Sequence, residues 1–191
     1  MARPSREDTI MAAALSVFVE RGYDGARIRH IAERAQVSDA ALYAHYASKE
    51  QLALALFCLH VGRYARALAE IAEDGARPVA ERIQAMARRT LQAFAEEPDA
   101  VAFVITHQRR FIHALPADFA YPIRVMEDVI REGQAVGAIR GGPVRLLAAL
   151  VFGCITQPIR TVLEAPPGTI ELTSETARAL TAESAWRAVA A

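Results

Sequence analysis

The sequence predicts an all-α protein of about nine helices. Apolar residues recur at three- and four-residue steps through most of the chain, which is the period of a helix with one buried face. Glycine and proline interrupt this pattern at intervals typical of helix boundaries. No stretch alternates with period two over enough length to predict a strand.

The first helix is expected to begin near Ser5, because Ser5 and Asp8 have the spacing of a capping pair. Gly22 is expected to end this helix. A short turn then leads into a second helix over about 27–35, for which neither flanking residue offers a side-chain cap. Asp24 is a possible substitute.

Residues 27–52 have the pattern of a helix-turn-helix. A tight break separates the helix at 27–35 from a second short helix at about 38–45, whose expected N-cap is Ser38. Two short helices joined in this way are typical of proteins that insert the second helix into the major groove of DNA. Ser48 and Gln51 have the spacing of a capping box that begins a long helix, which continues to about residue 74.

Five further helices complete the predicted fold. They are expected over about 79–97, 99–115, 122–136, 144–164 and 174–190. The segment at 144–164 is apolar almost all round, which implies burial on every side. We therefore expect residues 143–164 and 174–190 to form a homodimer interface, with two helices from each subunit. The predicted domains are 1–50, which contains the helix-turn-helix, and 51–191, which contains the dimerisation helices; the family resemblance described below implies that 51–191 is also the ligand-binding domain.

Composition argues against a partner recognised through net charge. The 191 residues carry 22 basic and 22 acidic side chains, and residues 1–50 contain seven of each. Cys58 and Cys154 lack the spacing of metal ligands and are expected to be buried, reduced thiols. The most apolar run, 146–155, is about half of the ~20 residues that span a bilayer. We expect a cytoplasmic protein without a signal peptide, a membrane segment, a metal or a cofactor.

Motifs for catalysis are also missing from the sequence. The five histidines form no H-E-x-x-H pattern, and none follows a glutamate at the spacing used in di-iron bundles. There is no glycine-rich phosphate loop and no G-x-S-x-G motif. The sequence therefore gives no support for an enzyme.

The string I31-A32-x-x-A35-x-V37-S38-x-x-x-L42-Y43-x-H45-Y46-x-S48-K49-E50-x-L52 closely resembles the DNA-binding signature of the TetR family of bacterial repressors. The resemblance is specific over residues 1–52, and it is looser beyond them, where the run at 132–140 also looks like the family. It implies a homodimeric transcriptional regulator that binds a near-palindromic operator and is released by a small molecule bound in the C-terminal bundle.

The resemblance also implies which side chains contact double-stranded operator DNA. Arg29 and Asp39 are the expected hydrogen-bonding candidates near bases, while alanines contribute apolar contacts. Two tyrosines, a histidine and a lysine match positions that contact the DNA backbone or wedge the helix in place, with Tyr43 expected to point outward. The full expected set is Arg29, Ser38, Asp39, Ala40, Ala41, Tyr43, His45, Tyr46 and Lys49.

This sequence departs from the family at a few positions. The family often has glycine where this chain has Gln36, so the turn requires a left-handed or otherwise altered conformation without glycine's freedom. Threonines usually stand where Ala26 and Arg27 are. The balanced charge and these departures keep a second function open, a helical small-molecule-binding or protein-interaction protein with weak or lost DNA binding.

A set of apolar and polar residues is the candidate lining of an effector pocket. Each residue alone is also compatible with plain core packing. His107 and Arg110 are the polar exceptions. They share a helix face and are suited to an anionic or hydrogen-bonding ligand, or else form an exposed polar face or a structural ion pair. The candidates are Phe57, Val61, Tyr64, Met86, Thr90, Phe94, Phe103, His107, Arg110, Phe111, Met126, Phe152 and Thr156.

Overall fold

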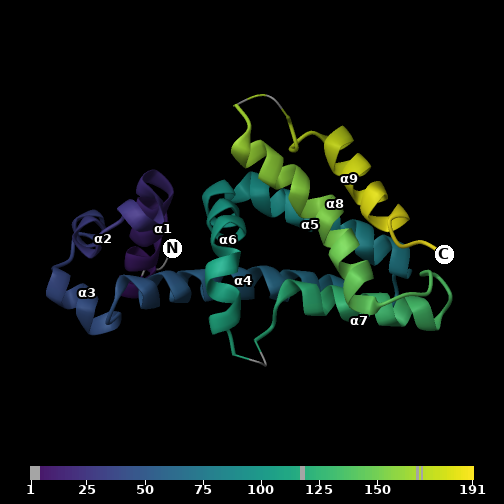
Figure 1. Ribbon diagram of the computed structural model, residues 1–191, viewed down its shortest axis with the longest axis horizontal. Helices are drawn as coiled ribbons and strands as arrows, with labels where there is room; N and C mark the ends of the chain where they lie inside the picture. Colours follow the sequence, from purple (N-terminus) through teal and green to yellow (C-terminus); the bar gives the residue numbers. More distant parts are fainter. Residues whose placement is uncertain (1–4, 117–118, 167, 169) are drawn as a thin grey trace. The chain divides into compact units, whose positions relative to one another are not determined.

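The computed structural model describes residues 5–116, 119–166, 168 and 170–191. Within these residues the fold is all-α, as predicted, with nine α-helices, one 3₁₀ turn and a single isolated β-bridge. The helices are labelled in Figure 1. Their bounds are α1 Arg6–Gly25, α2 Ile28–Ala35, α3 Asp39–His45, α4 Lys49–Ala72, α5 Val79–Glu96, α6 Pro98–Phe111, α7 Pro122–Ala135, α8 Val144–Glu164 and α9 Glu175–Arg187, with the 3₁₀ turn at Ile112–Ala114.

The helix ends follow the local signals in the sequence, with one exception. Ser5 and Asp8 form the expected capping box of α1, and Gly22 breaks this helix with φ 66° and ψ 166° before one further turn. The exception is α2, where Asp24 is not the cap. Instead, Nδ1 of His30 accepts a hydrogen bond of 3.3 Å from the backbone N–H of Arg27.

The described residues divide into two compact units. Unit 1 combines residues 1–60 with residues 99–117, and unit 2 combines residues 61–98 with residues 118–191. These units do not coincide with the expected boundary at residue 50. The main difference is α6, which belongs to unit 1 because its aromatic side chains contact the rings of Phe18 and Tyr23 in α1.

The core of unit 1 joins α1, α2, α3, the first part of α4 and α6. The packing of α1 against α2 and of α2 against α3 brings together the apolar faces that the sequence predicted. Burial of these side chains is the main source of stability in a small helical unit. The fully buried members with the largest side chains are Phe18, Phe57, Phe103, Phe111, Ile10, Ile31, Leu42, Leu52 and Leu56.

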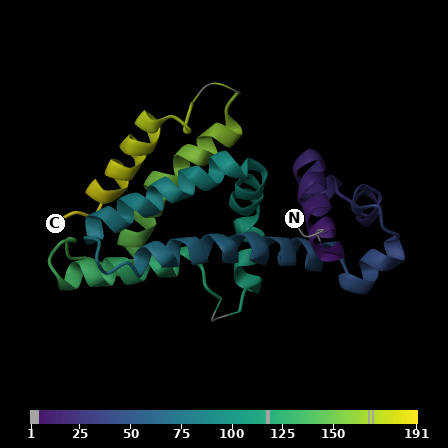
Figure 2. The ribbon, with the colours of Figure 1, turned by 180° about the vertical axis from the view of Figure 1, so that it is seen from behind.

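In unit 2, α5 packs against α9, and α8 packs against α7 and α9 (Figures 1 and 2). Its core includes Leu68, Ile83, Met86, Met126, Val129, Ile130, Leu147, Val151 and Ile155. A buried arginine ties three helices together at the edge of this core. Arg82 is 3% exposed and donates to the carbonyl of Ala72, at 2.7 Å, and to both carboxylate oxygens of Glu132.

Two apolar side chains pack directly against Gly133 in α7 and leave no room for a side chain there. A Cβ placed there would lie 2.4 Å from Cδ1 of Ile139 and 3.0 Å from a methyl group of Val79. Ile139 forms an isolated antiparallel β-bridge with Ala190, near the end of the chain, and this bridge holds Ile139 in position. The run at 132–140 therefore contacts both the start of α5 and the residues after α9.

Helices α4 and α8 are both long and apolar enough, by length and composition alone, to cross a membrane. In α8 only 28% of the most apolar window is buried within the single chain, which is less than the burial on every side that its composition predicts for the functional protein. Leu146 and Leu150 of this helix are 55% and 42% exposed, and Leu180 of α9 is 67% exposed. Unit 2 thus carries an apolar surface on its α8 and α9 helices.

Candidate nucleic-acid interface

The turn between α2 and α3 is built without glycine. Gln36 takes the left-handed conformation, with φ 55° and ψ 42°, as its position in the turn required. The backbone N–H of Gln36 donates to the carbonyl of Glu33 at 3.2 Å, and that of Val37 donates to the carbonyl of Ala32 at 3.0 Å. These bonds satisfy the carbonyls at the end of α2 and reverse the chain towards α3.

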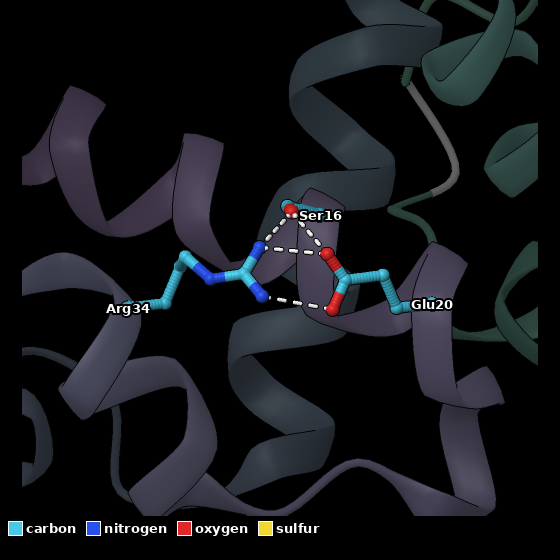
Figure 3. A network of polar contacts seen from close by, with 3 residues as sticks. All are labelled: Ser16, Glu20 and Arg34. Atoms are coloured by element: carbon cyan, nitrogen blue, oxygen red, sulfur yellow. Dashed lines mark hydrogen bonds and ion pairs between the residues drawn. The ribbon is translucent and has the colours of Figure 1, made fainter.

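An arginine on α2 fixes this helix to α1 (Figure 3). Both terminal nitrogens of Arg34 donate to the carboxylate of Glu20, each at 2.8 Å, and one of them also donates to the hydroxyl of Ser16. The hydrogen bonds from Arg34 hold the pKa of Glu20 below its ordinary value. Sequence reasoning missed this contact, although Ser16 and Glu20 are four residues apart and therefore share a face of α1.

Helix α3 is anchored by one residue and exposes most of the others. Leu42 is fully buried, and the hydroxyl of Ser38 accepts a hydrogen bond of 3.1 Å from the backbone N–H of Ala41. Asp39, Ala40, Tyr43 and His45 are exposed, with Tyr43 at 51%, and Ala41 is half-buried. Most of the expected groove-facing residues therefore reach solvent on the same short helix.

Tyr46 has the inward position that the spacing of the two tyrosines suggested for one of them. It is 9% exposed, and its hydroxyl donates to a carboxylate oxygen of Glu7 at 3.0 Å. Burial, together with the hydrogen bond to Glu7, raises the pKa of Tyr46 to about 12. Tyr46 therefore connects the end of α3 to the start of α1.

Lys49 also has partners within the protein. Its ammonium group donates to the carbonyls of Tyr23, at 2.7 Å, and Ala26, at 3.0 Å. It also lies 4.4 Å from the centroid of the Tyr23 ring. The sequence suggested an exposed lysine for a DNA phosphate, whereas Lys49 is half-buried.

The start of α2 carries exposed positive charge. Arg27 and Arg29 are exposed, and His30 is half-buried beside them. Burial and the nearby charges of Arg21 and Arg29 lower the pKa of His30. A neutral imidazole is required for Nδ1 to accept the hydrogen bond from Arg27, so this shift favours the observed cap.

The thirteen candidate effector residues fall into both units. Five of them lie in unit 1, where they form part of an aromatic cluster around Phe18 and Tyr23. The ring of Phe103 stacks on that of His107 at 4.6 Å, and Arg110 lies 4.1 Å from the Tyr23 centroid and 3.7 Å from the carboxylate of Asp24. These five are Phe57, Phe103, His107, Arg110 and Phe111.

The other eight candidates lie in unit 2. Tyr64 and Thr90 share a hydrogen bond between their hydroxyls, and Thr90 donates to the carbonyl of Met86 at 2.8 Å. Burial raises the pKa of Tyr64 above its ordinary value. Met86 and Met126 are fully buried core residues, whereas Phe152 and Thr156 are half-buried. The eight are Val61, Tyr64, Met86, Thr90, Phe94, Met126, Phe152 and Thr156.

Comparisons with known proteins agree with this arrangement. Residues 10–56 match the family model described as bacterial regulatory proteins, tetR family. The chain is 46% identical over 59 residues to the HTH-type transcriptional activator FasR of Mycolicibacterium smegmatis, a match that covers 31% of this chain and only 27% of that protein. It is 24% identical over 161 residues to the fatty acid metabolism regulator protein of Bacillus subtilis, with 80% of each chain covered.

The fold also resembles that of solved structures. The transcriptional regulator FadR from Bacillus subtilis, solved in complex with stearoyl-CoA, superposes with a TM-score of 0.73 at 18% identity, covering 94% of this chain and 95% of that one. At this identity the likeness concerns the fold alone. The similar proteins named here are regulators of transcription or metabolism rather than enzymes.

Proposed function

Since the chain belongs to the TetR family of bacterial regulatory proteins, we propose that this DNA-binding regulator is a repressor that a small-molecule effector releases from its operator. The observation that carries the proposal is the exposed surface of α3, which the buried Leu42 and the Ser38 cap hold against the rest of unit 1. A short helix presented in this way suits the major groove of DNA. A role at DNA also implies action in the cytoplasm.

The proposed interface divides into base contacts and backbone contacts. Arg29 has the donors to bind guanine O6 and N7, and Asp39 has the acceptors to bind cytosine N4. Ala40 and Ala41 offer only apolar contact, for example to a thymine methyl group. Tyr43 and His45 are exposed donors suited to phosphate oxygens, which fix the position of the helix on DNA.

Selection of duplexes from a random library by the purified protein tests DNA binding directly. We expect enrichment of a near-palindromic sequence with half-sites about one helical turn apart, because a two-fold dimer presents two α3 helices. Footprinting on the recovered duplex then locates both half-sites. Failure to enrich any sequence would favour the alternative function, a helical ligand-binding or protein-interaction protein.

We further propose that the protein acts as a homodimer through residues 143–164 and 174–190. The exposed leucines Leu146, Leu150 and Leu180 support this assignment, since contiguous apolar surface on a protein marks an interface. A second copy of the same chain is the proposed occupant, and an isologous four-helix contact would cover both surfaces at once.

The proposed effector is a long-chain acyl-CoA. The likeness to the Bacillus subtilis fatty acid regulator and to FadR solved with stearoyl-CoA supports this class of molecule. The methionine and phenylalanine content of the eight unit 2 candidates is compatible with an acyl chain. We expect stearoyl-CoA at micromolar concentration to release the selected duplex in a mobility-shift titration, and CoA alone to have no effect. Release by both compounds, or by neither, would contradict the acyl-chain assignment.

A further inference from the structure

Lys49 is the only lysine in the chain. All the other members of the 22 lysine and arginine residues are arginines, including those at exposed positions. A lysine and an arginine are not interchangeable, because an ammonium group is a compact charge with three donors, whereas a guanidinium group is a planar fork. The contacts of the Lys49 ammonium group are therefore not ones that the arginines elsewhere in the chain would reproduce.

The ammonium group of Lys49 forms its contacts within the protein. Two of its three donors bond to the carbonyls of Tyr23 and Ala26, at 2.7 and 3.0 Å. The charge also lies 4.4 Å from the Tyr23 centroid, within the range of a cation–π contact. The group is thus surrounded by acceptors and an aromatic ring before any DNA is present.

The two carbonyls belong to the segment where the chain passes from α1 to α2. This segment follows the break at Gly22, and Ala26 is the residue that ends α1. Carbonyls at a helix end lack partners within the helix, and a cation placed there is favourable. Because Arg27 is the N-cap of α2, the carbonyl of Ala26 lies next to the start of the helix-turn-helix. Lys49 therefore joins the first turn of α4 to the start of α2.

The ring under Lys49 is itself held firmly. Tyr23 stacks on Phe18 with centroids 5.7 Å apart and contacts Phe111 edge-on at 6.2 Å. Arg110 of α6 lies 4.1 Å from the same ring centroid. All of these residues belong to unit 1. Withdrawal of Lys49 towards a phosphate would break two hydrogen bonds and a cation–π contact with a ring that packs against Phe18, Phe111 and Arg110.

We propose that Lys49 is a positioning residue that fixes the start of α2 and the start of α4 to the end of α1, and that it contacts no DNA phosphate. Its effect on DNA recognition is then indirect, through the placement of α2 and α3. We call the contacts of Lys49 with Tyr23 and Ala26 the Lys49 clamp. The role of this clamp in DNA recognition rests on the DNA binding proposed above, whereas the existence of the clamp does not.

Because Lys49 is the sole lysine, chemical labelling reports on it directly. The protein is treated briefly with acetic anhydride, either native or unfolded in urea. Peptide mass spectrometry then gives the rate of Lys49 acetylation in each state. We expect at least a tenfold slower reaction in native protein, with no further slowing when the selected duplex is bound. Acetylation near the unfolded rate that DNA then suppresses would overturn the proposal.

Salt dependence of DNA binding provides the second test, with the duplex recovered from the random library as the probe. A lost phosphate contact reduces the slope of log affinity against log salt by about 0.9 for each contact removed. We expect Lys49→Met to lower affinity at least tenfold at every salt concentration and to leave the slope unchanged. A reduced slope would assign Lys49 to phosphate and contradict the clamp.

Lys49→Arg separates the two roles further. A phosphate contact tolerates this change because arginine binds phosphate well, whereas the larger guanidinium cannot take the place of the ammonium group between the two carbonyls and the ring without displacing one of them. We expect Lys49→Arg to bind DNA as poorly as Lys49→Met, and full rescue would overturn the proposal. Arg109→Met, an exposed change in the same unit, is the matched control. If no duplex is enriched, the proposed DNA binding fails, and the labelling rates still decide whether the clamp exists.

Discussion

Gln36 holds the α2–α3 turn in a backbone conformation that glycine adopts at lower cost. With φ 55° and ψ 42° it lies in the left-handed region, where a side chain is strained by roughly 1–2 kcal/mol. The hydrogen bonds of the turn nevertheless form, so the surrounding helices determine the conformation. The family often has glycine here, which agrees with the backbone that the structure shows.

We expect Gln36→Gly to stabilise the protein slightly. Relief of strain is partly offset by the roughly 0.5–1 kcal/mol that glycine's flexibility costs, so the net gain should be at most about 1 kcal/mol. Urea unfolding followed by circular dichroism measures it. Gln92→Gly, at an exposed position inside α5, is the control and should lose about 1 kcal/mol. A similar loss for Gln36→Gly would show that the left-handed turn is not strained.

The proposed preference of the protein for a particular DNA sequence depends most on Arg29. We expect Arg29→Ala to relax the preference at one base pair of each half-site, by about 1–3 kcal/mol of discrimination. Repeating the library selection with the variant measures this change, with Arg109→Ala as the control. An unchanged preference with weaker binding would instead assign Arg29 to the DNA backbone.

At the scale of elements, the pair of Arg82 and Glu132 connects α5 to α7 and to the end of α4. Arg82 is almost fully buried, while the Glu132 side chain is 49% exposed. The hydrogen bond from Arg82 lowers the pKa of Glu132 below its ordinary value of 4.5. A carboxylate with a lowered pKa stabilises the fold above its unfolded-state value, and this contribution is lost as the pH falls through the folded-state value.

We expect Glu132→Ala to reduce the free energy of unfolding at pH 7 by about 2 kcal/mol, because it leaves a buried guanidinium without its carboxylate. The half-exposed position of Glu132 keeps the loss below that of a fully buried pair. Thermal or urea unfolding at pH 7 and pH 3 should show the difference from wild type shrinking at the lower pH. Asp128→Ala, which removes an exposed pair with Arg131 on the same helix, should change little. A pH-independent loss would indicate packing rather than charge.

At the scale of the whole molecule, the proposed homodimer would cover the exposed leucines of α8 and α9. We expect Leu180→Arg to convert a dimer into a monomer, because it places a charge at a residue that is 67% exposed in the single chain. Sedimentation at micromolar concentration should show half the wild-type mass, and affinity for the selected duplex should fall at least 100-fold. Val136→Arg is the control, since Val136 is 68% exposed but lies outside both interface helices. A monomeric wild-type protein would contradict the dimer and the palindromic operator together.

The all-α class, the approximate positions of the helices, the caps at Ser5 and Ser38 and the break at Gly22 were predictable because each depends on residues close together in the chain. Periodicity identifies a buried face, and glycine, proline and serine mark helix ends through local backbone energetics. The DNA-binding signature was readable for the same reason, since residues 27–52 form one continuous stretch.

Only the tertiary structure decided which distant residues meet. Arg34 pairs with Glu20, Tyr46 with Glu7, and Lys49 with the carbonyls of Tyr23 and Ala26, each across a helix boundary. The same applies to α6, whose periodicity was clear but whose partners in unit 1 were not. A sequence pattern shows that a face must be buried or a charge satisfied, but the packing of the helices determines by which partner, because that choice depends on geometry between segments far apart in the chain.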